Sequence, residues 1–277
     1  MPELPEVEVT KLGVEPKIVG KTITNVRVID GRLRWPVLNN LKGILKGQSC
    51  ERITRRGKYL IFHLTKGYLL IHLGMTGVLR VLSVSDSLKP HDRVELQFGD
   101  ISLRLHDPRK FGAVMWHGFE EGSLDEHPLL KKLGVEPFGP EFKGSAGGKL
   151  LFEKSRKRSI SVKQYLLAGQ AVVGVGNIYC SESLFEAGIH PNKAAGSISL
   201  KKYEMLAEAV RQTLKKAIKA GGSSLKDFVN SEGEPGHFMM STKVYGRAGE
   251  SCRVCQSVIK QITQGQRSTF YCPQCQK

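Results

Sequence analysis

The spacing of hydrophobic and polar positions changes along the chain, and each pattern predicts a different structure. Residues 3–19 have helical spacing, and Glu3 and Glu6 lie in a first turn where the helix dipole favours negative charge. From about 22 to 117 the chain carries short, partly alternating segments separated by Gly, Asp or Pro, which we expect to form an antiparallel sandwich or barrel. The expected strands are ITNVRVI, YLIFHL, GYLLIHLGM, GVLRVL, RVELQF and ISLRL.

The second half of the chain has a helical period. Residues 134–148 are dense in Gly and Pro, which is typical of a linker, and residues 149–220 carry helical spacing that ends at a glycine pair. Residues 222–241 are rich in Gly and Ser and lack periodicity, so we expect a mobile loop there. The sequence therefore predicts an α+β multidomain protein. Its expected parts are a catalytic domain 1–133, a linker 134–148, a helical domain 149–243 that includes the loop, and a C-terminal module 244–277.

The charge of the chain points to a polyanionic partner. It has 42 Lys and Arg against 26 Asp and Glu, a net charge of +16, and a pI near 9.6. Such an excess is costly through self-repulsion, and it is typical of nucleic-acid binding. A membrane partner is disfavoured, because we find neither a basic amphipathic helix nor an apolar run of about 18 residues. The first residues lack a secretory signal pattern, so we expect a cytoplasmic location.

Four of the six cysteines form two C-x-x-C pairs, Cys252 with Cys255 and Cys272 with Cys275. This spacing is typical of a zinc ribbon in which each pair folds a tight turn around a tetrahedral ion. Two disulfides are the alternative, which a reducing compartment disfavours. Four thiolates leave no open position for water, so the sequence predicts one structural Zn²⁺. No strand–GxGxxG–helix unit predicts an organic cofactor.

Basic and glycine-rich segments predict contacts with a nucleic-acid backbone. GVGNIYC places Asn177 as an expected helix N-cap after glycines that let backbone amides approach an anion. Just upstream lies KSRKRSISVK, which ends at Lys163, and the two segments together favour DNA or RNA over a nucleotide. In the sheet region, Lys58 begins an apolar strand in RRGKYL, and Met75 lies on a glycine-flanked turn in HLGMTG. His91 lies in a basic loop, KPHDR.

The chain opens MPELPEVEV, and Pro2 has two interpretations. A proline early in a helix fits the first turn, because its fixed φ and missing N–H cost nothing there. Alternatively, loss of Met1 leaves Pro2 as a free secondary amine that acts as a nucleophile. These nine residues alone favour the first interpretation.

The motifs together resemble the formamidopyrimidine-DNA glycosylases, bacterial enzymes of base-excision repair. The resemblance rests on MPELPEVE, RRGKYL, HLGMTG, DPRKFG, VGVGNIYCSE, VYGR and CRVC…GQRSTFYCPQC, in the same order and spacing over essentially the whole chain. It implies an N-terminal β-sandwich with a flanking helix, a helix–two-turn–helix domain and a C-terminal zinc β-ribbon. It also implies a bifunctional enzyme that excises 8-oxoguanine and formamidopyrimidines and then cleaves the strand by β,δ-elimination.

The resemblance assigns roles to residues. The implied catalytic residues are Pro2 as nucleophile, Glu3, Lys58 and Arg267. The implied DNA contacts are His91, Lys110, Asn177 and Lys163, together with Met75, Arg109 and Phe111, which fill the space left by the extruded nucleotide. Lys110 occupies a position that is often Arg, which keeps the charge but loses bidentate phosphate geometry. The loop 222–241 is expected to close over the everted base, and the partner is duplex DNA with an oxidised purine opposite cytosine, bound by a monomer.

Two other functions remain to be weighed. An endonuclease VIII-like glycosylase of the same fold would prefer oxidised pyrimidines, and Leu4 argues against it because those relatives typically carry glycine there. A non-enzymatic zinc-ribbon DNA-binding protein would explain the charge and the cysteines equally well. It would not explain a proline exposed by removal of Met1, nor Lys58 beside an apolar strand.

Overall fold

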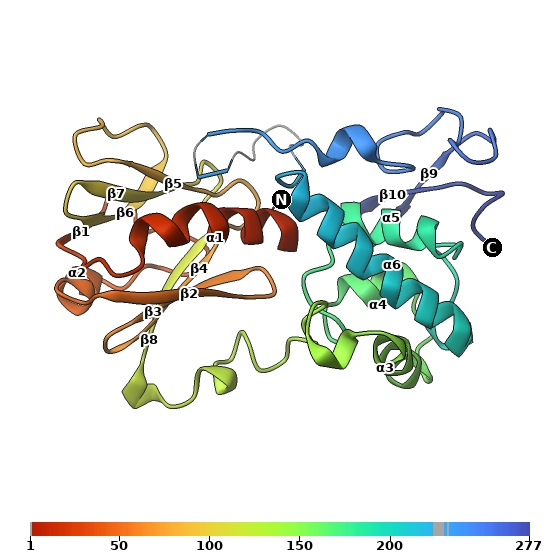
Figure 1. Ribbon diagram of the computed structural model, residues 1–277, viewed down its shortest axis with the longest axis horizontal. Helices are drawn as coiled ribbons and strands as arrows, with labels where there is room; N and C mark the ends of the chain where they lie inside the picture. Colours follow the sequence, from red (N-terminus) through yellow and green to blue (C-terminus); the bar gives the residue numbers. More distant parts are fainter. Residues whose placement is uncertain (1, 224–229, 232) are drawn as a thin grey trace. The chain divides into compact units, whose positions relative to one another are not determined.

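The computed structural model describes residues 2–223, 230–231 and 233–277. By its internal packing the chain divides into two units, Met1–Lys131 with Ala220–His237, and Lys132–Lys219 with Phe238–Lys277. The segment 220–237 thus packs with the N-terminal unit, although the chain reaches it only after the helices of the second. Figure 1 colours these elements along the chain. Among the described residues, no helix is long and apolar enough to cross a membrane.

The first unit is an antiparallel β-sandwich with a flanking helix, as the sequence predicts. Its described strands form two four-stranded sheets, ordered β1-β6-β7-β5 and β2-β3-β4-β8. The bounds are β1 Asn25–Val28, β2 Cys50–Arg56, β3 Tyr59–Leu64, β4 Gly67–His72, β5 Val78–Ser83, β6 Asp92–Phe98, β7 Ile101–His106 and β8 Ala113–Gly118. The helices are α1 Leu4–Ile18 and α2 Leu41–Leu45, with short 3-10 turns η1 Phe119–Glu121 and η2 Leu124–Glu126.

The core of the sandwich explains why helix α1 flanks it. Val7, Val14 and Ile18 lie on one face of α1 and are at most 1% exposed. They join a single apolar cluster with side chains from both sheets. Burying such a stripe stabilises the helix far more than its intrinsic propensity does. The same packing fixes the direction of α1, and so the place of the N-terminus.

Two strands were not singled out in the sequence. β2 reads CERITRR, and only Cys50 and Ile53 of it are buried, so its charged side chains hide the alternation. β8 reads AVMWHG and pairs with β4 over its whole length. Both segments become strands because they pair with β3 and β4, and a local sequence pattern does not show such pairing.

The second unit holds the helices and the ribbon. Its helices are α3 Ser145–Ser155, α4 Val162–Leu167, α5 Asn177–Glu186 and α6 Leu200–Lys219, with 3-10 turns η3 Pro140–Phe142, η4 Ala195–Ser197 and η5 Phe238–Ser241. The segment 134–148, expected to be a linker, already contains η3 and the first turn of α3. The ribbon strands are β9 Lys260–Gln264 and β10 Arg267–Tyr271. Phe185 of α5 completes their small core, because so short a segment has too few apolar residues to build a core alone.

An ion pair lies buried inside the first sheet. Arg104 on β7 donates from Nε to Glu95 Oε1 on β6 at 2.7 Å, and the two residues are 1% and 0% exposed. Ser102 donates to the same oxygen at 2.6 Å. Arg104 also donates to the carbonyls of Asp86 and Ser87, so the pair anchors the loop that follows β5. A buried charge left without its partner is strongly destabilising.

We therefore expect Arg104→Met to lower the free energy of unfolding of the first unit by about 3 kcal/mol, because Glu95 would stay buried without its main counter-charge. The matched control is Arg27→Met, since Arg27 pairs with the same carboxylate at 3.3 Å but its side chain is 48% exposed. We expect that control to cost less than about 1 kcal/mol. Urea unfolding followed by tryptophan fluorescence measures this, because both tryptophans, Trp35 and Trp116, lie in the first unit. Equal losses in the two variants would contradict the expectation.

Candidate functional site

The N-terminus is held by a carboxylate of its own helix. The backbone N–H of Glu3 donates to Glu6 Oε2 at 2.8 Å, and Glu6 Oε1 accepts the N–H and hydroxyl of Ser223 at 2.7 and 2.9 Å. Glu6 is 1% exposed, and Pro2 and Glu3 are buried as well. A chain end that would otherwise fray is thus fixed to the segment 220–237.

Lys58 lies in a tight turn and not on the strand that the sequence suggested. It forms the two-residue turn between β2 and β3 with Gly57, whose φ of 58° suits glycine. Arg55 donates from Nη1 to the Gly57 carbonyl at 2.9 Å and from Nε to Glu8 at 2.6 Å. Because Glu8 belongs to α1, this arginine ties the turn that carries Lys58 to the helix that carries Pro2.

The structure brings together the three residues expected to fill the space of the extruded nucleotide. Met75, Arg109 and Phe111 line one cavity of about 640 Å³. Met75 and Phe111 are 37% and 44% exposed, so this cavity presents apolar side chains to solvent. The Arg109 guanidinium lies 4.9 Å from the centroid of the Phe111 ring, within cation–π range.

The two loops that carry these side chains are fastened together. Asp107 accepts the Thr76 hydroxyl at 2.8 Å and the Gly112 N–H at 2.8 Å, so one buried carboxylate holds both loops. Gly74 has a φ of 63°, and a Cβ there would lie 2.3 Å from the Phe111 backbone. Only glycine allows the loops to approach so closely.

Sequence reasoning missed His72 and Arg34, which line the same cavity. Burial, with the nearby charges of Lys58 and Arg34, lowers the pKa of His72 to about 4, so its ring is neutral at pH 7. Its Nδ1 accepts the Gly74 N–H at 3.0 Å, and its ring lies 4.8 Å from that of Tyr59. The sequence signal for His72 was its position in HLGMTG, the motif in which Met75 was singled out.

Two of the predicted DNA contacts have an uncommon backbone conformation. His91 and Lys110 have φ values of 75° and 61°, which side-chain-bearing residues rarely adopt. Such conformations persist where the surroundings fix them, often at functional sites. Lys110 Nζ pairs with Asp30 at 2.9 Å, and His91 is exposed. Arg32 and Lys110 hold the pKa of the Asp30 carboxyl far below its usual range.

In the second unit, Lys163 and Asn177 serve the ribbon. Lys163 is 0% exposed and donates to the Ser268 carbonyl at 3.1 Å and the Thr269 hydroxyl at 2.7 Å. The expected DNA contact of Lys163 does not fit this placement, because the ammonium does not reach the surface. Asn177 donates to the same Ser268 carbonyl at 2.9 Å, and Gly176, not Asn177, is the N-cap of α5.

Both side chains therefore hold the strand that begins at Arg267. The turn before it, Gly265 and Gln266, has φ values of 52° and 61°, the signs that a type I′ hairpin requires. Arg267 is exposed at the first position of β10, beside the tip. The rigid hairpin thus presents a guanidinium to solvent.

A buried carboxylate joins the start of the ribbon to α5. Glu182 accepts the backbone N–H groups of Lys243, Val244 and Tyr245 at 2.7, 3.0 and 2.8 Å. Burial raises the pKa of Glu182, and the three N–H donors oppose that rise by stabilising the charged form. The VYGR motif is thereby fixed at its first residues.

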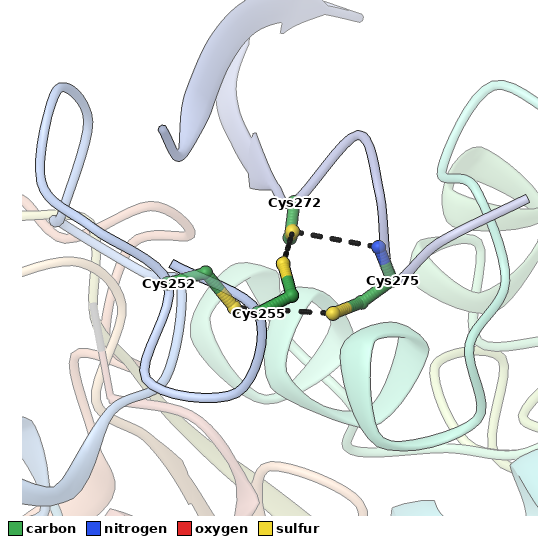
Figure 2. Close-up of side chains that lie close together, drawn as sticks. All are labelled: Cys252, Cys255, Cys272 and Cys275. Atoms are coloured by element: carbon green, nitrogen blue, oxygen red, sulfur yellow. Dashed lines mark hydrogen bonds between the residues drawn. The ribbon is translucent and has the colours of Figure 1, made fainter. Parts of the chain in front are cut away.

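The four ribbon cysteines fit a metal ion. Their sulfurs all lie within 4.8 Å of one another, with Cys252 to Cys275 at 3.9 Å and Cys255 to Cys272 at 3.4 Å (Figure 2). A tetrahedral zinc with bonds of about 2.3 Å holds its sulfurs about 3.8 Å apart. Backbone N–H groups of Val254 and Cys275 point at two of the sulfurs, as expected around thiolate ligands. The set holds one structural Zn²⁺.

The buried hydrogen bonds of Lys163 to β10 lead to a prediction for the protein without DNA. We expect Lys163→Met to speed amide hydrogen exchange in β10 by about tenfold or more, because the buried acceptors at Ser268 and Thr269 would lose a charged donor. Lys157→Met is the matched control, since Lys157 is exposed in the same basic stretch. Unchanged exchange in the Lys163 variant would show that the ribbon does not depend on this lysine.

Family models match the chain in three successive parts. The formamidopyrimidine-DNA glycosylase N-terminal domain matches residues 1–114, and the H2TH domain of the same enzymes matches residues 133–229. A zinc finger found in FPG and IleRS matches residues 249–277. The order agrees with the sandwich, the helices and the ribbon described above.

Curated relatives and solved structures agree over full length. The chain is 65% identical over 277 residues to a formamidopyrimidine-DNA glycosylase of Polynucleobacter necessarius, and 54% identical over 280 residues to one of Paraburkholderia phymatum, covering all of both chains each time. A Lactococcus lactis FPG mutant bound to Fapy-dG DNA matches with a TM-score of 0.91 at 35% identity. MutM in complex with carbocyclic 8-oxo-G DNA matches with a TM-score of 0.90 at 36% identity, and both structures are covered completely. The chain belongs to the formamidopyrimidine-DNA glycosylase family.

Proposed function

We propose that the protein excises oxidised purines from duplex DNA and then cleaves the strand at the resulting abasic site. The observation that carries this proposal is the family match along the whole chain, with Pro2 at its start and the Met75–Arg109–Phe111 cavity in the same unit. The solved relatives hold Fapy-dG and an 8-oxo-G analogue, which supports purine lesions as substrates. We place the protein in the cytoplasm, acting as a monomer on lesions opposite cytosine.

Base removal begins with eversion of the damaged nucleotide, because the sugar cannot be attacked inside the stack. Pro2, once Met1 is removed, offers a secondary amine; terminal amines have a pKa of about 7.7–8.0, so part of the population is unprotonated near neutral pH. The nitrogen bonds to C1′ while the glycosidic bond breaks and its electron pair leaves with the base. The amine then loses its proton, and Glu3, adjacent to it, acts as general acid by giving a proton to O4′ as the C1′–O4′ bond breaks. The sugar opens, and an iminium is left at C1′.

Strand cleavage follows from the iminium that this attack creates. The iminium is an electron sink, so the proton on C2′ becomes acidic and its loss expels the 3′ phosphate by β-elimination. A second, δ-elimination expels the 5′ phosphate and leaves a one-nucleoside gap. Lys58 serves as proton donor and phosphate contact, and its turn is held to α1 by Arg55.

DNA is gripped by both units. Met75, Arg109 and Phe111 occupy the space of the everted nucleotide, and Arg109 faces the orphaned cytosine. His91, Lys110 and Asn177 contact the DNA backbone, and Arg267 holds the phosphates beside the lesion. Zinc supplies no chemistry to the reaction; the four cysteines around it keep the Arg267 hairpin rigid. The loop 222–241 is proposed to cover the everted base, although residues 224–229 and 232 lie outside the described part of the chain.

The nucleophile is tested by chemical trapping. We expect borohydride to trap a covalent adduct between the native protein and 8-oxoguanine DNA, and no adduct with Pro2→Gly whose amine is blocked, because only an amine forms the reducible iminium. Binding of a duplex with a non-cleavable abasic analogue is the control that the blocked variant is folded. Trapping that persists in the blocked variant would shift the nucleophile to a lysine.

A lesion panel separates the proposed function from the related one. Duplexes with 8-oxoguanine, formamidopyrimidine and thymine glycol should give faster release of the two purine lesions. Preference for thymine glycol would favour the endonuclease VIII-like function. Intact-mass measurement under gentle conditions reports both the loss of Met1 and the bound zinc.

The metal is tested at one ligand. We expect Cys272→Ser to lose zinc and to weaken binding of damaged DNA about tenfold or more, because the hairpin that presents Arg267 loses its clamp. Cys50→Ser is the matched control, since Cys50 is a buried thiol outside the four. Zinc content and binding affinity are measured on the same samples. Loss of zinc with unchanged affinity would show that the ribbon does not clamp DNA.

A further inference from the structure

A buried arginine of the first unit donates its hydrogen bonds to the loops that carry the proposed DNA contacts. Arg93 on β6 is 7% exposed. Its Nε donates to the Asp107 carbonyl at 2.8 Å, and Nη1 donates to Asp30 Oδ2 at 3.0 Å. Nη2 lies 3.4 Å from the Pro108 carbonyl and 3.2 Å from His91 Nδ1. The buried guanidinium cannot reach a phosphate itself. It binds instead the loops that carry His91 and Lys110, the proposed phosphate contacts.

The contact with His91 determines where the ring carries its proton. Arginine has five donors, no acceptor and a charge that it does not lose in proteins. His91 Nδ1 must therefore be the acceptor, which leaves the single N–H of the neutral ring on Nε2. Because His91 is exposed, that N–H is the group that the ring offers to a ligand.

The backbone of His91 is fixed as firmly as its ring. The His91 carbonyl accepts the Asp107 N–H at 3.0 Å, and Asp92 Oδ2 accepts the Lys89 N–H at 2.9 Å, which closes the turn. The ring packs edge-on against His106, with centroids 5.9 Å apart. These contacts hold His91 at a φ of 75°, a conformation that is strained for a residue with a side chain and persists only where its surroundings fix it.

We propose that Arg93 is a positioning residue, which sets the orientation and tautomer of His91 so that Nε2–H meets a DNA phosphate. The inference rests on the proposed function, in which His91 contacts the DNA backbone. A ring that is already oriented loses little freedom on binding, and so more of its hydrogen-bond energy appears as affinity. Arg93 acts through His91 and does not touch DNA.

The test is a double-mutant cycle on binding of a duplex that contains a tetrahydrofuran abasic analogue. We expect Arg93→Met and His91→Ala each to raise Kd about tenfold, and the double variant to exceed His91→Ala by less than about threefold. Arg93→Met should fold, because Asp30 keeps Arg32 and Lys110 as partners. Arg27→Met removes the same charge from the same sheet, away from this loop, and should leave Kd within about twofold. A double variant about a hundredfold weaker would overturn the proposal, because the two residues would then act independently.

The tautomer is read directly by ¹⁵N NMR of histidine-labelled free protein. In the native chain we expect His91 to show a protonated Nε2 and an unprotonated Nδ1, and in Arg93→Met a mixture of both tautomers. Arg93→Lys is the second variant; it keeps a charge near Asp30 but not the planar fork, and should lie between the two. An unchanged His91 tautomer in both variants overturns the proposal. Native protein that fails to bind lesion DNA contradicts the proposed function instead, while the tautomer measurement still decides the role of Arg93.

Discussion

A chain end has a neighbour on one side only, so a reactive N-terminal amine needs an interaction from elsewhere to hold it in place. Here that interaction is the carboxylate of Glu6. It accepts the N–H of Glu3 with one oxygen and two groups of Ser223 with the other. The packing of α1 against both sheets sets the direction of the helix, and Glu6 then fixes its first turn to Ser223 in the segment 220–237. The chemistry proposed at Pro2 depends on both.

The same arrangement recurs in the described parts of the molecule: a buried charged side chain holds a loop, and several of these loops carry proposed DNA contacts. Arg93 holds the loop of His91, Asp107 fastens the turns of Met75 and Phe111, and Arg104 anchors the loop after β5. In the second unit Lys163 and Glu182 do this for the ribbon. A charge-assisted hydrogen bond is directional and roughly twice as strong as a neutral one, so it suits a loop that lacks an apolar face of its own. Part of the charge of +16 is thus structural rather than free to meet DNA.

A basic motif in the sequence therefore does not show that each of its charged side chains is exposed. Lys163 lies in a basic stretch, and its neighbours Lys157 and Arg158 are exposed, yet it is the one that is buried. Asn177 follows glycines as a cap would, but its side chain serves the ribbon and Gly176 takes the cap position. Both residues were noticed in the sequence, but the ribbon carbonyl that each of them binds lies about a hundred residues further along the chain, where a local pattern does not reach.

By itself the sequence determined the sandwich, the helical region, the zinc ribbon and the family, and it supplied the proposed reactive groups, because periodicity, C-x-x-C spacing and motif order are local properties of a chain. The tertiary structure alone decided which side chains gather. It placed Met75, Arg109 and Phe111 in one cavity with the unnoticed His72 and Arg34, and packed residues 220–237 against the first unit. It also revealed Arg93 as the partner of His91. Such contacts depend on strand register and loop closure, and a local pattern does not encode which distant residue will supply the matching donor or acceptor.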